Sequence, residues 1–304
     1  MNWNRSVCEM AGHKGICLVS TEVYYFSGTG NSLHVAKELQ KRIPEARLKP
    51  IISLVDRESV RASGETVGFV FPHYASSLPK VVHAFIDKLD LGSARYLFAM
   101  ATRGGTKTMA FTEIDSILKR KGRRLDSFFV FTMPSGSEPL TKDYASRMTE
   151  ERILRLESEM LARLDTIQRT IVDREISREP DTGDVTPPPV LVPFLPLVDA
   201  VSPLLIPLGK LVETTFDFYC DDKCTGCGVC EKVCLAERVR VVDGRPVWQE
   251  TVPCHGCFAC LNYCPEESIQ VKSRWYLKSY TDQNGRYHHP EITANDIARQ
   301  KKGD

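Results

Sequence analysis

Two short stretches in the last third of the chain contain most of its cysteines. One runs from Cys224 to Cys234 and the other from Cys254 to Cys264, and both have the spacing C-x2-C-x2-C-x3-C. Two-residue spacers curl the backbone so that three thiolates converge on one iron–sulfur cube, while the fourth thiolate points to a second cube. The spacing therefore predicts two [4Fe-4S] clusters. The first would be held by Cys224, Cys227, Cys230 and Cys264, and the second by Cys254, Cys257, Cys260 and Cys234.

Zinc and a disulfide framework are the alternative uses of these cysteines. A tetrahedral zinc site takes two separated C-x2-C pairs and has no use for the third interleaved cysteine of each run. Disulfide frameworks are typical of small secreted domains, whereas this chain has 304 residues and no apolar signal segment is expected at its start. Iron–sulfur ligation fits better. Pro265 follows Cys264 as in bacterial-type ferredoxins, but Leu235 stands where proline usually follows the other fourth cysteine.

A loop near the other end of the chain has the composition of an anion site. The segment Ser27–Ser32 reads S-G-T-G-N-S and lies between a predicted strand and a helix predicted over 31–43. Glycines let the backbone approach an anion, N–H groups and the helix dipole attract it, and hydroxyls add hydrogen bonds. The G-K-[ST] of triphosphate loops and the full G-x-G-x-x-G are absent.

The loop resembles the flavodoxin loop [ST]-x-T-G-N-[ST] at every defined position. The alternative is a turn of small residues that caps the helix. The resemblance implies that the phosphate of FMN is bound by Ser27, Gly28, Thr29, Gly30, Asn31 and Ser32.

Strand and helix patterns alternate from about residue 19 to 178. Apolar runs predict strands near 23–26, 67–71, 96–101 and 128–133, with a weaker one at 47–51, and helical spacing predicts helices at 31–43, 79–89, 106–120 and 144–177. This alternation predicts an α/β fold whose parallel sheet is covered on both faces. Five strands in the order 2-1-3-4-5, with the ligand at the switch point, are the flavodoxin-like doubly wound solution.

Ligands of such sheets bind at the carboxyl ends of the strands, so two further loops should flank the flavin ring. Tyr74 is the candidate for stacking on the ring, and an aromatic that caps the core is the alternative. Arg103 is interpreted as a solvated arginine, with a place beside the pyrimidine side of the flavin as the alternative. His73 is interpreted as a loop histidine. The predicted ring contacts are Pro72, Tyr74, Ala75, Thr102, Arg103, Gly104 and Gly105.

The chain divides into an N-terminal extension (1–18), a flavodoxin-like domain (19–178), a proline-rich linker (179–214), a cysteine-rich α+β domain (215–272) and a tail (273–304). The apolar stretch 190–208 contains four prolines and Asp199, which argue against a membrane-spanning helix. We expect it to pack along the domains; attachment to a membrane surface is the less favoured alternative. A short strand at 269–271 should close the cysteine-rich domain. No chemistry is assigned to the tail.

The net charge and the cysteines indicate which partners and which cellular compartment suit this chain. The net charge is +1, which gives no general case for binding nucleic acid or membranes. Cluster ligation and the remaining thiols Cys8, Cys17 and Cys220 fit a reducing cytoplasm.

Taken together, residues 19–272 resemble the fused flavodoxin–ferredoxin electron-transfer proteins of the EFR-type ferredoxin family. The resemblance rests on the loop Ser27–Ser32, the two ring-flanking loops and the two cysteine runs. It implies FMN, a bacterial-type 2[4Fe-4S] ferredoxin domain, and low-potential electron transfer between redox protein partners that it does not identify. We expect the cysteine-rich domain to dock over the carboxyl-end face of the sheet. The alternatives are a substrate-reducing flavoenzyme fed by its own clusters and, less favoured, a redox or iron sensor.

Overall fold

Five apolar segments of the N-terminal half form one parallel sheet. The computed structural model describes residues 20–135, 149–179, 181, 183, 216–272 and 285–303. The sheet strands are β1 (Thr21–Tyr25), β2 (Arg47–Pro50), β4 (Thr66–Pro72), β6 (Tyr96–Arg103) and β7 (Ser127–Thr132). Their order is β2-β1-β4-β6-β7 and every pair is parallel. The sheet confirms the predicted order 2-1-3-4-5, including the strand at 47–50 that had the weakest sequence signal.

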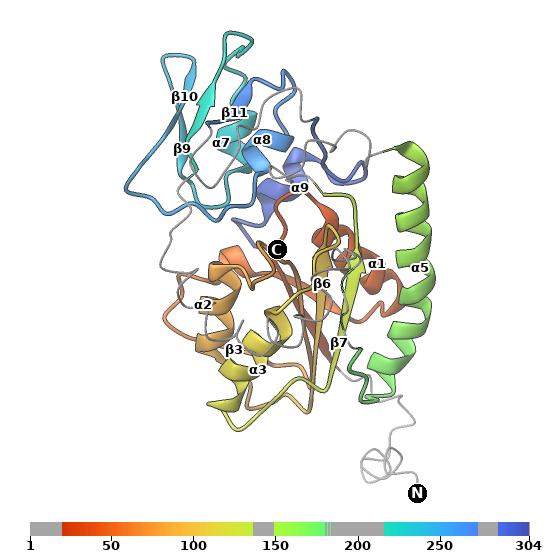
Figure 1. Cartoon of the computed structure of the whole chain (residues 1–304). Helices are drawn as coiled ribbons and strands as arrows, with labels where there is room; N and C mark the ends of the chain where they lie inside the picture. The colour runs from red at the N-terminus through yellow and green to blue at the C-terminus, as the bar shows by residue number, and fades with distance from the viewer. Residues whose placement is uncertain are drawn as a thin grey trace, which may run out of the picture.

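Helices cover both faces of the sheet, as the strand–helix alternation predicts (Figure 1). Helices α1 (Asn31–Arg42) and α5 (Glu150–Val172) pack together on one face, and α2 (Lys80–Lys88) and α3 (Ala110–Lys119) on the other. The buried stripe of α5 includes Leu156, Met160, Leu164, Ile167 and Ile171. This helix is shorter than the predicted 144–177.

Both ends of α5 have a local cause. Thr149 is its N-cap, and the side chain of Thr149 accepts a hydrogen bond from the backbone N–H of Arg152. At the other end Arg174 adopts a left-handed φ of 55°, which a continuing α-helix does not allow. Beside the sheet, the short strands β3 (Val60–Arg61) and β5 (Leu89–Asp90) pair in parallel, and a 3-10 turn, η2 (Ile51–Ser53), follows β2.

The cysteine-rich part is a small α+β unit with its own core. Strands β8 (Phe218–Cys220) and β11 (Ile269–Val271) pair antiparallel, and β9 (Val239–Val242) and β10 (Arg245–Trp248) form a hairpin. The predicted strand at 269–271 is confirmed. Each cysteine run contains one short helix, α7 (Val229–Val233) or α8 (Ala259–Asn262). The apolar core of this unit includes Val239, Phe258, Leu261, Ile269 and Val271.

The C-terminal segment 285–303 lies between the sheet and the cysteine-rich unit (Figure 1). It contains α9 (Ala294–Arg299), which a capping box of Thr293 and Asp296 begins. The predicted N-terminal extension, most of the linker and the apolar stretch 190–208 lie outside the described residues. Among the helices that are described, none combines the length and the apolarity needed to cross a bilayer.

Candidate functional site

Four cysteines from both runs line one pocket of the cysteine-rich unit. The pocket brings Cys264 of the second run to Cys224, Cys227 and Cys230 of the first run. The Sγ atom of Cys264 lies 3.3 Å from the hydroxyl of Ser268. This is the crosswise set that the spacing predicts for the first cluster.

The second set of thiols is also assembled crosswise. Burial raises the pKa of Cys254, Cys257 and Cys260, and the neighbouring Cys234 raises all three further. Cys234 is therefore a near neighbour of all three thiols, and Cys230 of the first set also lies near Cys260. Ligation of a metal by these thiols would displace their protons.

The spacing of the sulfur atoms discriminates between the kinds of metal centre. A tetrahedral zinc ion with Zn–S bonds of about 2.3 Å holds its sulfurs about 3.8 Å apart. Among the described residues, no three cysteine sulfurs lie within 4.8 Å of one another. The nine described cysteines also form no disulfide with one another. The sulfurs are thus spaced more widely than a closed tetrahedral zinc site holds them; an all-thiolate donor set suits either zinc or an iron–sulfur cube, and the wider spacing fits the cube.

The loop Ser27–Ser32 is buried at the carboxyl end of β1, where the switch point of the sheet lies. Side chains tie it to the neighbouring strands. Asn31 Nδ2 donates to the carbonyl of Pro134 at 2.6 Å, and the hydroxyls of Ser32 and Thr102 lie 2.8 Å apart. The loops after β1, β6 and β7 thus meet, as predicted for a ligand site at this edge.

This loop offers unpaired donors for an anion. The hydroxyl of Ser27 is buried, and within the described chain it has no hydrogen-bond partner. The same part of the chain provides no acceptor for the N–H groups of Gly28, Thr29 and Gly30, and no side chain caps α1. Unpaired buried donors are costly unless a ligand satisfies them. A phosphate group fits this cradle.

The cysteine-rich unit rests directly on the loop. A Cβ atom at Gly28 would lie 2.5 Å from the carbonyl oxygen of Cys257 and 3.0 Å from the hydroxyl of Tyr74. Only glycine permits so close an approach. The ring of His255 also meets Phe26 edge-on, with centroids 6.0 Å apart. These contacts confirm the expected docking of the unit over the carboxyl-end face and place the second set of cysteines nearest the loop.

Tyr74 lies in a tight turn beside these contacts. Tyr74 and Ser77 exchange backbone hydrogen bonds of 3.0 Å, and Ala75 and Ser76 between them have φ values of 48° and 65°. The ring of Tyr74 packs edge-on against Phe26, at 6.3 Å between centroids. Burial holds the pKa of Tyr74 well above its usual range. These contacts match an aromatic that caps the core, and stacking of Tyr74 on a flavin stays a prediction.

The interpretation of Arg103 as a solvated side chain is wrong. Its side chain is 5% exposed, forms an ion pair with Asp181 and donates through Nε to Thr132 Oγ1 at 3.2 Å. Asp181 lies just past the end of the predicted flavodoxin-like domain, and its carboxylate neutralises the guanidinium of Arg103 at the end of β6. A free positive charge beside a flavin is therefore not available from Arg103.

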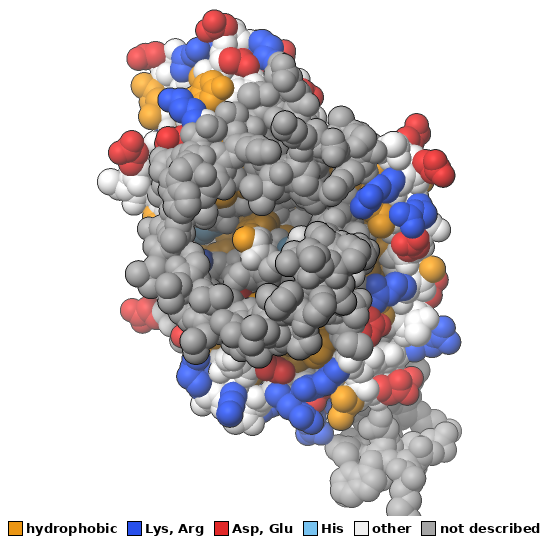
Figure 2. Space-filling view, viewed as in Figure 1, with side chains coloured by type: hydrophobic (Ala, Val, Ile, Leu, Met, Phe, Trp, Pro, Cys, Tyr) orange, Lys and Arg blue, Asp and Glu red, His pale blue; other side chains and the backbone are white. Residues whose placement is uncertain are grey.

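The remaining predicted ring contacts occupy the same edge of the sheet. Pro72 is paired in register with Thr102, and Ala75 is exposed at the turn. His73 lies 3.2 Å from Thr106 Oγ1 through Nε2, and burial together with the charge of Arg103 lowers the pKa of His73 to about 4. In the face shown in Figure 2, basic and acidic side chains are interspersed over the described part of the surface.

The C-terminal segment covers the loop from a further side, which the sequence did not predict. The Gln300 carboxamide accepts from the N–H of Ser27 at 3.0 Å and donates to the Ser27 carbonyl at 2.8 Å. The N–H of His289 donates to the Thr29 carbonyl at 2.8 Å. The hydroxyl of Tyr287 donates to Asn31 Oδ1 at 3.2 Å. The one local signal available in the sequence was the capping box of α9.

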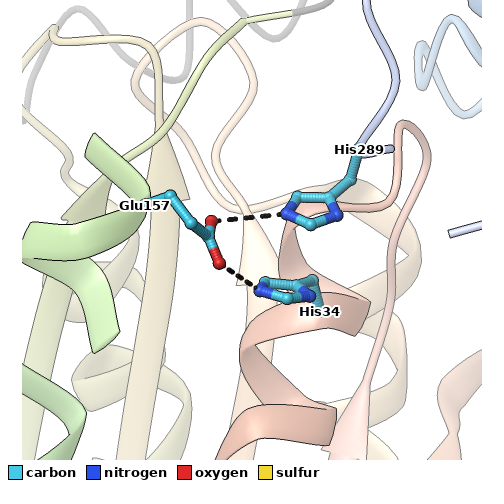
Figure 3. Close-up of side chains that lie close together, drawn as sticks. All are labelled: His34, Glu157 and His289. Carbon is cyan, nitrogen blue, oxygen red and sulfur yellow. Dashed lines mark hydrogen bonds and ion pairs between the residues drawn. The ribbon is translucent and has the colours of Figure 1, made fainter. Parts of the chain in front are cut away.

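A cluster of three side chains joins this segment to α1 and α5 (Figure 3). Glu157 lies 2.6 Å from Nε2 of His34 and 3.4 Å from Nε2 of His289. Burial alone would raise the pKa of Glu157, but hydrogen bonds from the two histidines lower it to about 2. The cluster therefore contains an ionised carboxylate between two imidazoles.

The same three residues are close enough to suggest a metal site, but their orientation does not suit one. The rings of His34 and His289 are stacked, with centroids 3.7 Å apart and planes inclined by 20°, so their lone pairs run side by side and do not converge. In addition, Nδ1 of His289 accepts from the N–H of Glu291 at 3.3 Å, which leaves the proton on Nε2. The cluster is a hydrogen-bonded contact between α1, α5 and the C-terminal segment.

Comparisons with known proteins give limited information about this chain. No protein-family model and no curated protein matches it. Among solved structures, it is similar to a putative flavoprotein from Bacteroides uniformis, with 18% identity over 37% of this chain and 89% of that one and a TM-score of 0.29. It is also similar to an NADH:FMN oxidoreductase in its apo form, with 13% identity over 50% of this chain and 90% of that one and a TM-score of 0.29. At these scores neither likeness carries an argument about fold or function.

Proposed function

We propose that this chain is an electron-transfer protein that passes low-potential electrons between two [4Fe-4S] clusters and FMN. The observation that carries the proposal is the contact of Cys257 with Gly28, which joins a predicted cluster ligand to a loop with unpaired anion-binding groups. This contact would bring the two sites close enough to exchange electrons. When bound, the clusters would exchange single electrons and the flavin one or two.

The two cysteine sets have different surroundings, and this suggests a direction for the route. Cys227 of the first set is exposed, whereas Cys257 of the second set is packed against the loop. A protein partner can approach the first set from solvent. The second set then lies between the partner and the flavin site, so electrons would pass through both clusters in series.

The chain's own side chains would bind the groups and exclude water from them. Val233, Phe258 and Leu261 are buried beside the two cysteine sets. In the loop, the Ser27 hydroxyl and the unpaired N–H groups would hold the phosphate without a positively charged side chain. The Ser32–Thr102 hydrogen bond fixes the start of α1 against the ring-flanking loop.

A substrate-reducing flavoenzyme is the second candidate. It is favoured by His73, whose Nδ1 is buried with no hydrogen-bond partner in the described chain. A neutral histidine that follows β4 could accept a proton or a hydrogen bond from a substrate in a pocket there. Reduction of a small organic substrate by the isolated protein would favour this candidate over a carrier.

The composition of the purified protein tests the proposal. Protein isolated without oxygen should contain about eight irons and about eight acid-labile sulfides per chain, as two [4Fe-4S] clusters require, with one FMN. About four irons would mean that one cysteine run is misinterpreted. Zinc in place of iron, or the absence of flavin, would contradict the corresponding half of the proposal.

A further inference from the structure

Within the described chain, the C-terminal segment 285–303 contacts the phosphate loop at positions that the cysteine-rich unit does not. Cys257 lies against Gly28, and the segment makes hydrogen bonds to Ser27, Thr29 and Asn31. The loop is therefore enclosed on two sides by parts of the chain that follow it by more than 200 residues.

Two features indicate that this closure is specific. Gly30 has a φ of 100°, and a Cβ atom there would lie 2.9 Å from Cβ of Ile292 and 3.0 Å from Cβ of His289, so the segment fits against a glycine. Gln300 has no exposed surface, and its carboxamide pairs with both backbone groups of Ser27. A buried side chain that satisfies one backbone position twice is specific to that position.

The segment is held at its other contacts by charged and aromatic groups. His289 joins the cluster with Glu157 and His34 (Figure 3), and Asp296 pairs with Lys37 of α1 at 3.0 Å. Tyr263 of the cysteine-rich unit donates to the Ile292 carbonyl at 3.0 Å. One segment thus contacts the loop, the sheet domain and the cysteine-rich unit.

We propose that segment 285–303 is a strap that closes the phosphate cradle, so that the site accepts a flavin ending in a phosphate monoester and rejects a flavin dinucleotide. The proposal rests on the proposed function, because it concerns the same FMN site. The Ser27 hydroxyl and the loop N–H groups would hold a terminal phosphate, with Cys257 on one side of the loop and the strap on another. A larger pyrophosphate would need additional room beside the loop, where the strap lies. The strap must also open for FMN to enter or leave.

Flavin binding to strap variants tests the proposal. The full-length protein is purified without oxygen, its clusters are retained and its flavin is removed by dialysis. Binding and release of FMN, FAD and riboflavin are then followed by flavin fluorescence. Gln300→Ala removes both hydrogen bonds to Ser27. Tyr287→Phe is a milder variant that removes only the hydroxyl bonded to Asn31. Gln249→Ala, at an exposed glutamine of the cysteine-rich unit, is the matched control.

The wild-type chain and Gln249→Ala should bind FMN and reject FAD. Gln300→Ala should exchange FMN about tenfold faster, equivalent to about 1.4 kcal/mol and within the net contribution of two hydrogen bonds, and should gain measurable FAD binding. Tyr287→Phe should change both properties in the same direction by less.

Equal exchange rates in the wild type and both strap variants, or wild-type binding of FAD as tight as that of FMN, would overturn the strap while leaving FMN binding intact. Failure of the wild type and every variant to bind any flavin would overturn the flavin proposal, and the strap proposal with it.

Discussion

The contact between Gly28 and Cys257 can be perturbed with a single methyl group. In Gly28→Ala the new Cβ would lie 2.5 Å from the Cys257 carbonyl oxygen and 2.7 Å from its Cβ. Ordinary contact begins near 3.4 Å, so the loop that carries Cys257 must retreat by roughly 0.9 Å. The atoms in the way are backbone or directly attached to it, so a side-chain rotation cannot relieve the overlap.

The cost of this substitution should be that of overpacking a close interface. Extra methyl groups in well-packed regions destabilise proteins by about 1–3 kcal/mol. Gly28 has no left-handed φ, so no backbone strain adds to this value. The midpoint of thermal unfolding should fall by several degrees. The shift of Cys257 should alter the electron paramagnetic resonance of the second cluster, whereas the first cluster should keep its signal.

Gly92→Ala is the matched control, because among the described residues its Cβ would approach just the side chains of Asp90, at 3.2 Å from Oδ1, and Arg61, at 3.9 Å. It should leave the unfolding midpoint and both cluster signals close to those of the wild type. If Gly28→Ala behaved in the same way as Gly92→Ala, the loop and the second cysteine set would not be in contact, and the argument from their proximity would fail.

Three further predictions concern the ligand sets, the C-terminal segment and a buried ion pair. Cys264→Ala in the second run should remove the first cluster, and Cys234→Ala in the first run should remove the second cluster. Electron paramagnetic resonance spectra in which Cys264→Ala loses the second cluster, or Cys234→Ala the first, would refute the crosswise sets. Burial would raise the pKa of Glu157, but hydrogen bonds from two histidines lower it from 4.5 to about 2; its stabilisation of the segment is therefore complete above about pH 4.5 and is lost as the pH falls toward 2. Cleavage of the segment by pepsin should increase over that range, and a rate that changes no more than that of an unstructured peptide would contradict this. Asp181→Ala removes the carboxylate partner of the buried Arg103 and should lower the free energy of unfolding by about 3–5 kcal/mol. The exposed Arg61→Ala should change it by about 1 kcal/mol or less, and similar values for the two variants would argue against a buried pair.

The parts of the fold that follow from local spacing were predictable from sequence. The apolar runs predicted the strands, the strand–helix alternation predicted a parallel sheet covered on both faces, and the flavodoxin-like interpretation predicted the strand order. The spacing C-x2-C-x2-C-x3-C gave the crosswise gathering of Cys264 and Cys234, because each fourth cysteine follows a turn of helix that directs it away from its own run. Local backbone geometry determines these features, so the spacing of residues in the sequence was enough to predict them.

Long-range contacts were not predictable in this way. Gln300 meets Ser27 across 273 positions of the chain, and no periodic pattern marks either residue as a partner of the other. Arg103 was assigned to solvent because its partner, Asp181, lies in a stretch whose composition predicted a linker. His34 and His289 likewise come from helix α1 and the C-terminal segment, which only the folded chain brings together.

Electron exchange within a single chain is the central claim, and rapid anaerobic mixing tests it most directly. Protein reduced by less than one electron per chain is followed by the absorbance of its clusters and of its flavin. Proximity of the two sites predicts that electrons redistribute between clusters and flavin at a rate independent of protein concentration. A rate that rises in proportion to protein concentration would contradict the claim. So would a flavin that stays oxidised beside reduced clusters when the solution potential is below the reduction potential of the flavin.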